Sequence, residues 1–255
     1  MTSSLFDLTG KIALITGSSQ GLGFTIARGL GEAGATIILN GRNEEKLEKA
    51  DSTLSLQGLK VYSCSFDVTD GHEISQKIAP LESLVGPIDI LVNNAGIQRR
   101  GPLETMDERA WREVIDTNLT GIFLITQQVV QGMIGRKKGK IINICSMMSE
   151  FGRATVGPYA ASKGGVKMLT RSMAVEWGKH NIQVNGLGPG YFVTEMTRPL
   201  AEDPKFDVYL RSRTPAARWG DPSELIGTAV FLASPASDFV NGQIIYVDGG
   251  LSAAL

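Results

Sequence analysis

The sequence is poor in the residues that build disulfide frameworks and metal centres. It contains two cysteines, Cys64 and Cys145, and two histidines, His72 and His180, in no spacing typical of a metal-ligand cluster. We therefore expect neither a disulfide framework nor a bound metal. So few cysteines are typical of a reducing compartment.

The chain also lacks an excess of either charge. Its 255 residues include 25 Lys and Arg and 26 Asp and Glu, which gives a formal net charge of −1 at pH 7. This balance does not indicate a polyanion-binding surface, so we expect no nucleic-acid partner.

Long hydrophobic runs are missing as well. The longest uncharged stretch, residues 117–135, contains several amide and hydroxyl side chains, and we predict a buried core helix there and no membrane association. Residues 1–10 show no basic region followed by an apolar run, so we expect no signal peptide and a cytoplasmic location.

What the sequence does contain is a regular alternation of strand and helix patterns. Short β-branched runs predict strands at residues 11–16, 36–39, 60–66, 88–92, 140–145, 182–187 and 243–247. Helical patterns lie between them, at residues 22–34, 44–56, 73–85, 108–134, 158–178 and 222–233. Continuous apolar strands are typical of a parallel sheet covered on both faces. We predict an α/β chain with one domain over residues 1–255, a Rossmann-like, doubly wound parallel sheet of about seven strands with helices on both faces.

Two further features bear on this architecture. An eight-unit β/α barrel also fits an alternating chain of this length. Periodicity does not exclude it, and the glycine-rich loop after the first predicted strand decides in favour of the doubly wound sheet. The one long irregular stretch, about residues 188–220, is rich in proline and charge. Loops of this length are commonly functional, and we expect this one to cover a substrate.

A glycine-rich loop follows the first predicted strand and leads into an apolar helix. Glycines there allow the backbone to approach a pyrophosphate, whose charge is met by the helix N-terminus. An ordinary glycine turn is the alternative, but a strand before and a helix after are the context that dinucleotide binding requires. We predict a cofactor site that includes Gly17, Ser19, Gln20, Gly21, Leu22 and Gly23.

The residues after the second predicted strand indicate which dinucleotide is preferred. Dinucleotide folds that use NAD have an acidic residue there, whereas this chain has Asn40-Gly41-Arg42-Asn43. A guanidinium can bind a 2′-phosphate, so Arg42 favours NADP(H), with NAD(H) possible. A solvated Arg42 at a helix start is the alternative, and Ser19 and Gln20 supply no second positive charge.

Three side chains predict proton-transfer chemistry. Tyr159 and Lys163 are four residues apart, on one face of a predicted helix. A nearby ammonium favours the phenolate and makes tyrosine a usable acid or base. Ser146 ends a predicted strand, at the edge where ligands of open α/β sheets bind. Each feature alone is common, and a serine after a strand is often a cap.

Together with Asn93-Asn94-Ala95-Gly96 and with Asn118 inside a helical pattern, these motifs resemble the classical short-chain dehydrogenase/reductases over essentially the whole chain. The resemblance implies hydride transfer to or from a nicotinamide, and a catalytic tetrad of Asn118, Ser146, Tyr159 and Lys163. In it, Tyr159 exchanges the substrate proton, Ser146 orients the substrate oxygen, and Lys163 lowers the tyrosine pKa and binds the nicotinamide ribose. Asn118 bends its helix and holds a relay water. Further implied cofactor contacts are Asp67, Val68, Asn94, Ala95, Gly96, Tyr159, Lys163, Pro189, Gly190, Val193 and Thr194.

The family resemblance also implies a homotetramer. The helical patterns at residues 108–134 and 158–178 carry apolar residues on more than one face, including Ile122, Phe123, Met168, Leu169 and Met173. Excess apolar surface of this kind indicates burial against another subunit. Burial within the monomer is the alternative for about half of these side chains.

A finer resemblance is carried by residues 94–100, 144–150, 214–220 and 238–242, which are similar to gluconate 5-dehydrogenases. It implies interconversion of D-gluconate and 5-keto-D-gluconate. A small polyol-acid substrate needs a cation for its carboxylate and polar partners for its hydroxyls. Candidate substrate residues are Gln98, Arg99, Arg100, Ser146, Glu150 and Arg153. A subunit interface or a solvated loop is the alternative place for each charged one.

Two other functions share much of this machinery. A 3-oxoacyl carrier-protein reductase has the same cofactor loop and tetrad, and Arg99 and Arg100 would suit an acidic carrier. A non-catalytic nucleotide-binding sensor on the same fold is the other alternative, and the intact Ser146, Tyr159 and Lys163 count against it.

Overall fold

The computed structural model describes residues 5–254 of the chain. Seven strands in this range form one sheet in the order β3-β2-β1-β4-β5-β6-β7, and all neighbouring strands are parallel. The strands are β1 Ile12–Ile15, β2 Thr36–Gly41, β3 Val61–Ser65, β4 Ile90–Asn93, β5 Gly139–Ile144, β6 Ile182–Pro189 and β7 Ile244–Val247. The predicted doubly wound sheet is confirmed, and its separate edge strands β3 and β7 exclude a closed barrel.

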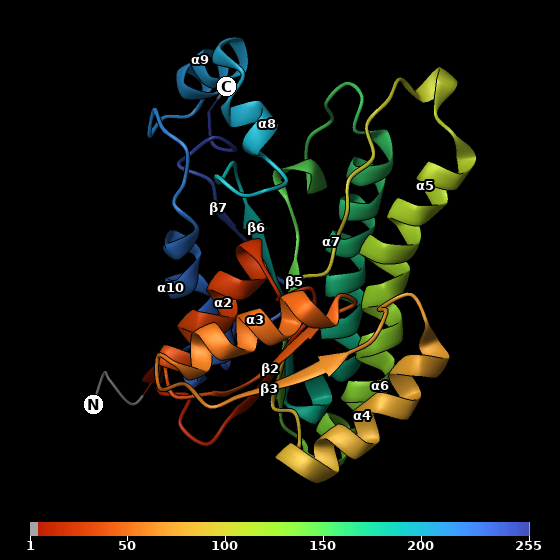
Figure 1. Ribbon diagram of the computed structural model, residues 1–255, viewed down its shortest axis with the longest axis vertical. Helices are drawn as coiled ribbons and strands as arrows, with labels where there is room; N and C mark the ends of the chain where they lie inside the picture. Colours follow the sequence, from red (N-terminus) through yellow and green to blue (C-terminus); the bar gives the residue numbers. More distant parts are fainter. Residues whose placement is uncertain (1–4, 255) are drawn as a thin grey trace.

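Helices cover both faces of the sheet (Figure 1). α2, α3 and α10 pack on one face, whereas α4, α6 and α7 pack on the other. The helices are α2 Gly21–Glu32, α3 Glu44–Ser55, α4 Gly71–Val85, α5 Glu108–Ile115, α6 Gly121–Arg136, α7 Gly157–Trp177, α8 Arg198–Ala201, α9 Pro204–Arg213 and α10 Ile226–Ala233. Short 3₁₀ turns occupy Leu103–Thr105, Met147–Ser149, Gly178–His180, Pro222–Leu225 and Pro235–Ser237.

Alternate residues of a strand enter the two cores. In β1, Ala13 and Ile15 belong to the core beneath α2, and Leu14 belongs to the core beneath α4 and α6. Because successive strand residues point to opposite faces and both faces are covered, all three residues are apolar and buried. This arrangement accounts for the continuous hydrophobic runs of the sequence.

The helix predicted at residues 108–134 is wrong in one respect, because it is interrupted. A π-helical turn, Asp116–Thr120, joins α5 to α6, and the backbone N–H of Gly121 donates to the carbonyl of Asp116 five residues earlier. Within this turn the Asn118 side chain is fully buried. A hydrophobic pattern does not distinguish a single π turn from a continuing α-helix.

Residues 188–220 contain more regular structure than predicted. β6 continues through Pro189, and α8 and α9 follow within the segment. The Asp203 carboxylate caps α9 by accepting from the backbone N–H of Lys205 at 3.0 Å, and Pro204 stands in the first turn. A proline that suggested an irregular loop therefore begins a helix. Similarly, the helix predicted at residues 222–233 opens as the 3₁₀ turn Pro222–Leu225 before α10.

The predictions for the ends of the chain are covered only in part, because residues 1–4 and 255 lie outside the described residues. No helix within residues 5–254 is long and apolar enough to cross a lipid bilayer.

The strand order creates a crevice at the centre of the sheet. From β1 the chain runs outward to β3, and it then returns to the other side of β1 as β4. The loops that follow β1 and β4 therefore leave the sheet in opposite directions. In open α/β folds this switch point is where ligands bind, at the carboxyl ends of the strands.

Candidate active site

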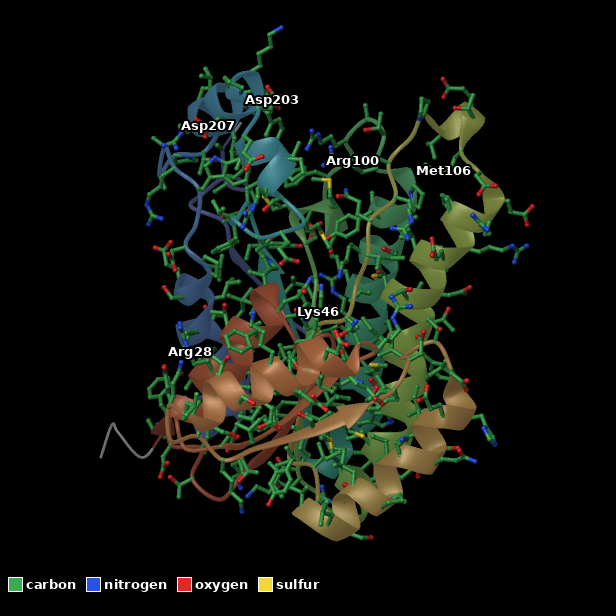
Figure 2. The ribbon with its side chains drawn as sticks, in the orientation of Figure 1. Arg28, Lys46, Arg100, Met106, Asp203 and Asp207 are labelled. Atoms are coloured by element: carbon green, nitrogen blue, oxygen red, sulfur yellow. The ribbon has the colours of Figure 1, made fainter. Side chains whose placement is uncertain are left out.

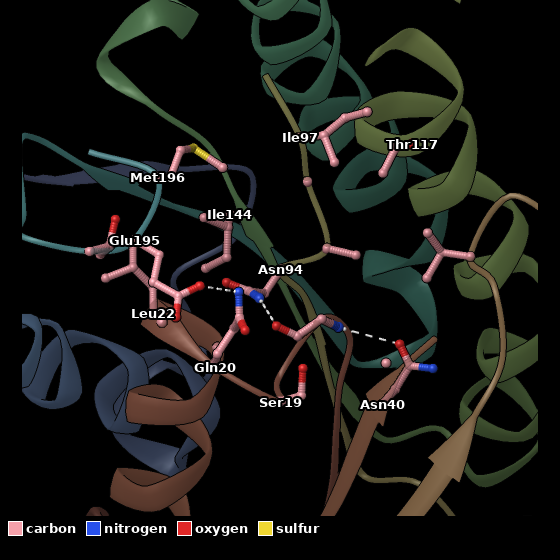
Figure 3. Close-up of a pocket in the computed structure, with 18 of the residues that line it drawn as sticks. Ser19, Gln20, Leu22, Asn40, Asn94, Ile97, Thr117, Ile144, Glu195 and Met196 are labelled. Atoms are coloured by element: carbon pink, nitrogen blue, oxygen red, sulfur yellow. Dashed lines mark hydrogen bonds between the residues drawn. The ribbon is translucent and has the colours of Figure 1, made fainter. Parts of the chain in front are cut away.

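A cavity of about 430 Å³ opens at this switch point, and the loops after β1 to β6 contribute to its walls (Figure 3). The predicted cofactor residues that line it are Gly17, Ser19, Gln20, Gly21, Leu22, Gly23, Arg42, Asp67, Val68, Asn94, Ala95, Gly96, Tyr159, Lys163, Pro189, Gly190 and Thr194. Val193 is not among the lining residues; its side chain is exposed, and Phe192 lines the cavity beside it. The structure thus brings together residues from most of the chain.

Two glycines of the loop after β1 lie too close to their neighbours for any side chain. Gly17 has a left-handed backbone with φ 61°, and a Cβ there would lie 2.8 Å from the Cα of Ala95. A Cβ on Gly23 would lie 2.3 Å from the Asn94 amide nitrogen. The loop after β1 therefore packs directly against the loop after β4.

Hydrogen bonds fix this contact. The Asn94 amide donates to the carbonyls of Thr16 and Gly17, both at 2.9 Å, and the Thr16 hydroxyl accepts from the backbone N–H groups of Asn94 and Ala95, both at 3.0 Å. On the other side, Asn40 accepts from the Gly17 N–H at 3.3 Å (Figure 3). The glycine loop is held between β2 and β4.

The start of α2 fits a phosphate group. No side chain caps this helix N-terminus, and its first turn contains no acidic residue. Gly21 has φ 62°, and the space where a Cβ would stand is open. Helix-terminal N–H groups together with the positive end of the helix dipole form an anion site. The residues present therefore fit the pyrophosphate of a dinucleotide.

The end of the cavity beside β2 carries two cations. Arg42 Nη1 lies 3.2 Å from Asp67 Oδ2, and Lys46 Nζ donates to Gln20 Oε1 at 2.9 Å. Burial disfavours the Asp67 carboxylate, but hydrogen bonds from Thr69 and Arg42 outweigh this effect and lower the pKa of that carboxyl. Ser19 and Gln20 supply no positive charge, as expected, but Lys46 brings a second cation to this end of the cavity. The missed signal is Lys46 in the first turn of the helix that follows Arg42, because the start of that helix lies beside the end of β2.

Ser146, Tyr159 and Lys163 meet at the other end of the cavity. Ser146 follows β5, and its hydroxyl accepts from the Met148 N–H at 3.1 Å, which caps the turn Met147–Ser149. Tyr159 and Lys163 lie one turn apart on α7. Lys163 Nζ lies 5.7 Å from the centre of the Tyr159 ring and donates to the Ile144 carbonyl at 2.5 Å.

Burial sets the protonation of these groups. It lowers the pKa of Lys163 to about 8, because the ammonium loses hydration. It raises the pKa of the Tyr159 phenol, although a hydrogen bond with Ser146 acts to lower that pKa. This direction is opposite to the one expected from the Tyr159–Lys163 spacing, so the phenol of the protein alone is neutral at pH 7.

Asn118 lies beside the cavity, while its neighbour Thr117 lines it. The Asn118 amide accepts from the Ile97 N–H at 2.8 Å and donates to the Ile97 carbonyl at 2.9 Å and to the Ser162 hydroxyl at 3.1 Å. It therefore fastens the segment after β4 to α7. The relay water implied by the family resemblance stays a prediction.

Of the candidate substrate residues, Ser146 alone is among those that line the cavity. Arg99 forms an ion pair with Glu113 of α5 at 2.9 Å. Glu150 accepts from Lys167 and, at 2.8 Å, from the Tyr246 hydroxyl. These bonds direct Arg99 and Glu150 to other parts of the protein. Gln98 also lies outside the lining.

Arg100 and Arg153 have a different environment. Arg153 donates to the Tyr191 hydroxyl at 3.1 Å, and its guanidinium lies 4.5 Å from the centre of the Phe206 ring. Burial lowers the pKa of Arg100, and the nearby Arg153 charge lowers it further. Tyr191 is electrostatically coupled to both Arg100 and Tyr159. A cluster of two cations thus lies toward the Tyr159 side of the cavity (Figure 2 labels Arg100).

The fold and these residues define a nicotinamide-dependent dehydrogenase site, and comparison with known proteins identifies the class. The sequence profile of the short chain dehydrogenases matches residues 11–205, and the chain belongs to this family.

Individual relatives are similar over their full length. The chain is 56% identical to the 5-keto-D-gluconate 5-reductase of Escherichia coli K12, over 99% of this chain and 100% of the relative. It is 51% identical to the gluconate 5-dehydrogenase of Gluconobacter oxydans, over 98% of each chain. A crystal structure of a Burkholderia cenocepacia gluconate 5-dehydrogenase in complex with NADP and tartrate superposes with a TM-score of 0.98, at 50% identity and 100% coverage of both chains.

The packing at Gly23 predicts that Gly23→Ala displaces the Asn94 side chain and distorts the glycine loop. We expect a loss of dinucleotide affinity of at least about tenfold and a loss of unfolding free energy of roughly 1–3 kcal/mol. Calorimetric titration with NADPH and urea unfolding measure the two effects. Gly135→Ala, on open surface, is the matched control; equal behaviour of the two variants would contradict the packing argument.

The burial of Lys163 predicts a pH-dependent stability. Its folded-state pKa of about 8 lies below the ordinary lysine value near 10.4, so the unfolded chain binds more protons between these pH values. The contribution of this group to stability therefore rises with pH in that window. We expect the stability of the wild type relative to Lys163→Met to increase from pH 8 to pH 10 in urea unfolding. With the exposed control Lys49→Met, the difference should stay constant.

Proposed function

We propose that this protein is an NADP(H)-preferring oxidoreductase that interconverts D-gluconate and 5-keto-D-gluconate. The observation that carries the proposal is one continuous site: a dinucleotide-fitting cavity, the Ser146–Tyr159 pair inside it, and an unbalanced pair of arginines beside it. The relatives named for gluconate and 5-keto-D-gluconate, similar over their full length, support the same substrate.

The residues present assign the parts of the cofactor. The uncapped start of α2 would hold the pyrophosphate, Arg42 the 2′-phosphate, and Lys163 the nicotinamide ribose. When bound, the nicotinamide ring supplies or accepts the hydride. The Burkholderia neighbour, whose structure contains NADP, supports this cofactor.

Tyr159 would move the proton. In reduction its hydroxyl proton goes to the substrate carbonyl oxygen as hydride adds to the carbonyl carbon, and in oxidation both transfers reverse. Because burial raises the pKa of this phenol, Tyr159 is protonated and ready to act as the acid at neutral pH. Ser146, which hydrogen-bonds Tyr159, would donate to the same substrate oxygen. The oxidation direction needs the phenolate and should accelerate as the pH rises.

Arg100 would bind the substrate carboxylate. Among residues 5–254 it forms no ion pair or hydrogen bond that would neutralise it, and its charged neighbour is another cation, Arg153. Two like charges side by side are unfavourable until an anion joins them. An aldonate carboxylate supplies that anion and can accept two bonds from the guanidinium. Tartrate, which is present in the Burkholderia neighbour, is likewise a hydroxy acid.

The rival 3-oxoacyl carrier-protein reductase is less well supported. An acidic carrier would need Arg99 and Arg100 together as one basic patch. Arg99 is paired with Glu113, so the two arginines do not form one free basic surface. The intact Ser146–Tyr159 pair continues to argue against a non-catalytic sensor.

We further propose a homotetramer in the cytoplasm, with residues 188–220 covering the substrate. Phe123 of α6 and Met168 of α7 are 46% and 55% exposed, whereas Ile122 and Met173 of the same helices are buried in the core. Exposed apolar side chains on these helices suit a contact with a second copy of the chain. Pro189, Gly190, Phe192 and Thr194 through Thr197 all line the cavity, which suits a covering segment.

Initial rates with NADPH and 5-keto-D-gluconate test the proposal, with an acetoacetyl thioester as the rival substrate and NADH as the rival cofactor. We expect turnover of the keto acid with NADPH, and a loss of about 10²- to 10⁴-fold in Tyr159→Phe. NADPH binding should survive in that variant, because the rest of the cavity is intact. Turnover of the thioester alone would discard the substrate, and an unchanged rate in Tyr159→Phe would discard the mechanism.

The different environments of Arg99 and Arg100 predict that substitutions of these two adjacent residues have different effects on KM. Arg100→Met should raise the KM for 5-keto-D-gluconate by about 10- to 100-fold, because a charge-assisted bond to the carboxylate is lost. Arg99→Met removes a charge from the adjacent residue and breaks its pair with Glu113 and its bond to the Gln98 carbonyl, and it should leave KM nearly unchanged. Equal effects in steady-state kinetics would show that Arg100 has no special role.

A further inference from the structure

We propose that Lys46 is a second ligand of the cofactor 2′-phosphate and a determinant of the preference for NADP(H) over NAD(H). The inference rests on the proposed function, since it assumes a dinucleotide in the cavity. It adds to Arg42 a residue on a different element, the first turn of α3.

The N-terminal cap of α3 fixes the backbone position of Lys46. Asn43 caps α3, and its side chain accepts from the Lys46 backbone N–H at 2.8 Å. Arg42, Asn43 and Lys46 all line the cavity, beside Gly41 at the end of β2. Figure 2 labels Lys46 on α3, some way from Arg100. Lys46 and Arg100 therefore belong to different parts of the site.

Without Lys46, the charges of Arg42 and Asp67 cancel at this end of the cavity. Arg42 is already paired with Asp67 at 3.2 Å, so its charge is balanced. Lys46 forms no ion pair among residues 5–254, and its side-chain partner is the neutral amide oxygen of Gln20 at 2.9 Å. Lys46 is therefore the cation at the β2 end of the cavity that is free of an ion pair within this range and can pair with an added negative charge.

A 2′-phosphate and a 2′-hydroxyl differ in the charge that they bring to the end of the cavity beside β2. A phosphate monoester carries about −1.5 to −2 charge at neutral pH, whereas the hydroxyl of NAD(H) carries none. Arg42 and Asp67 together carry a net charge near zero, and Lys46 adds a positive charge beside them, while the nearby Glu195 carboxylate bonds Gln20 and forms no ion pair with Lys46. Lys46 thus strengthens binding of the phosphorylated cofactor and has little effect on the other.

Gln20 allows Lys46 to move without leaving a buried group unpaired. The Lys46 stem is flexible, and the residue is exposed. Gln20 keeps a second bond, from its Nε2 to Glu195 Oε2 at 2.6 Å, when Lys46 turns toward a phosphate (Figure 3 shows this bond). The exchange of a neutral acceptor for a charged one favours the phosphate.

Calorimetric titration of the full-length protein with two nucleotide fragments tests this proposal directly. Adenosine 2′,5′-bisphosphate carries the 2′-phosphate, and adenosine 5′-monophosphate lacks it. The wild type should bind the bisphosphate more tightly. Lys46→Gln should weaken bisphosphate binding by about tenfold, leave 5′-monophosphate binding unchanged, and reduce the salt dependence of the bisphosphate Kd.

Two variants provide the controls. Lys49→Gln removes an equal charge from the next turn of α3, where the side chain is exposed and does not line the cavity, and it should bind both fragments like the wild type. Lys46→Arg keeps the charge and should retain most of the preference. Since Lys46 is an exposed residue, all three variants should unfold at the wild-type temperature.

The outcomes separate this inference from the proposed function. If the wild type prefers the bisphosphate and Lys46→Gln keeps the full preference, Lys46 is not a ligand, and NADP(H) use stands on Arg42 alone. If the wild type binds both fragments equally, the NADP(H) preference itself is wrong, and the role of Lys46 falls with it. An equal loss in Lys49→Gln would show a general charge effect and would also overturn the proposal.

Discussion

The close contact between the loops after β1 and β4 is the constraint on which the rest of the site depends. Gly17 and Gly23 leave no space for a Cβ, and the Asn94 amide bonds both Thr16 and Gly17 across the junction. This contact turns the chain sharply into α2, so that the uncapped helix N-terminus points into the cavity. It also fixes the direction of the segment after β4, which Asn118 then ties to α7. This one junction between the two loops therefore positions both the part of the cavity beside α2 and the part that contains Ser146, Tyr159 and Lys163.

The charged and titratable side chains at the two ends of the cavity differ in burial. Beside β2, Arg42 and Lys46 are exposed, so solvent screens the attraction between their charges and an anion. At the other end, Lys163 and Tyr159 lose hydration, and their pKa values move in the directions that favour the neutral forms. A neutral phenol is a proton donor, which suits reduction of a carbonyl near neutral pH. A charge close to Tyr159, or the loss of its hydrogen bond with Ser146, would shift the pKa of the phenol.

Much of the fold and of the candidate site could be predicted from the sequence, because the signals are local. Continuous apolar strands, the glycine loop and the Tyr159–Lys163 spacing each depend on a few consecutive residues, and the strand ends differ from the predicted ones by no more than two residues. The features that were missed depend on contacts between distant residues. The pairs Arg99–Glu113 and Glu150–Lys167 remove two candidate substrate residues from the site. Neither these pairs nor the π turn at Asn118 leaves a mark in a hydrophobic pattern.

In the proposed reaction, hydride moves between a nicotinamide at this cavity and carbon 5 of a six-carbon keto acid. Reduction of 5-keto-D-gluconate with NADPH carrying two deuterium atoms at nicotinamide C4, followed by NMR of the product, tests it most directly. We expect D-gluconate with one deuterium, at C5. A product that carries no deuterium, or carries it at another carbon, would exclude this hydride transfer.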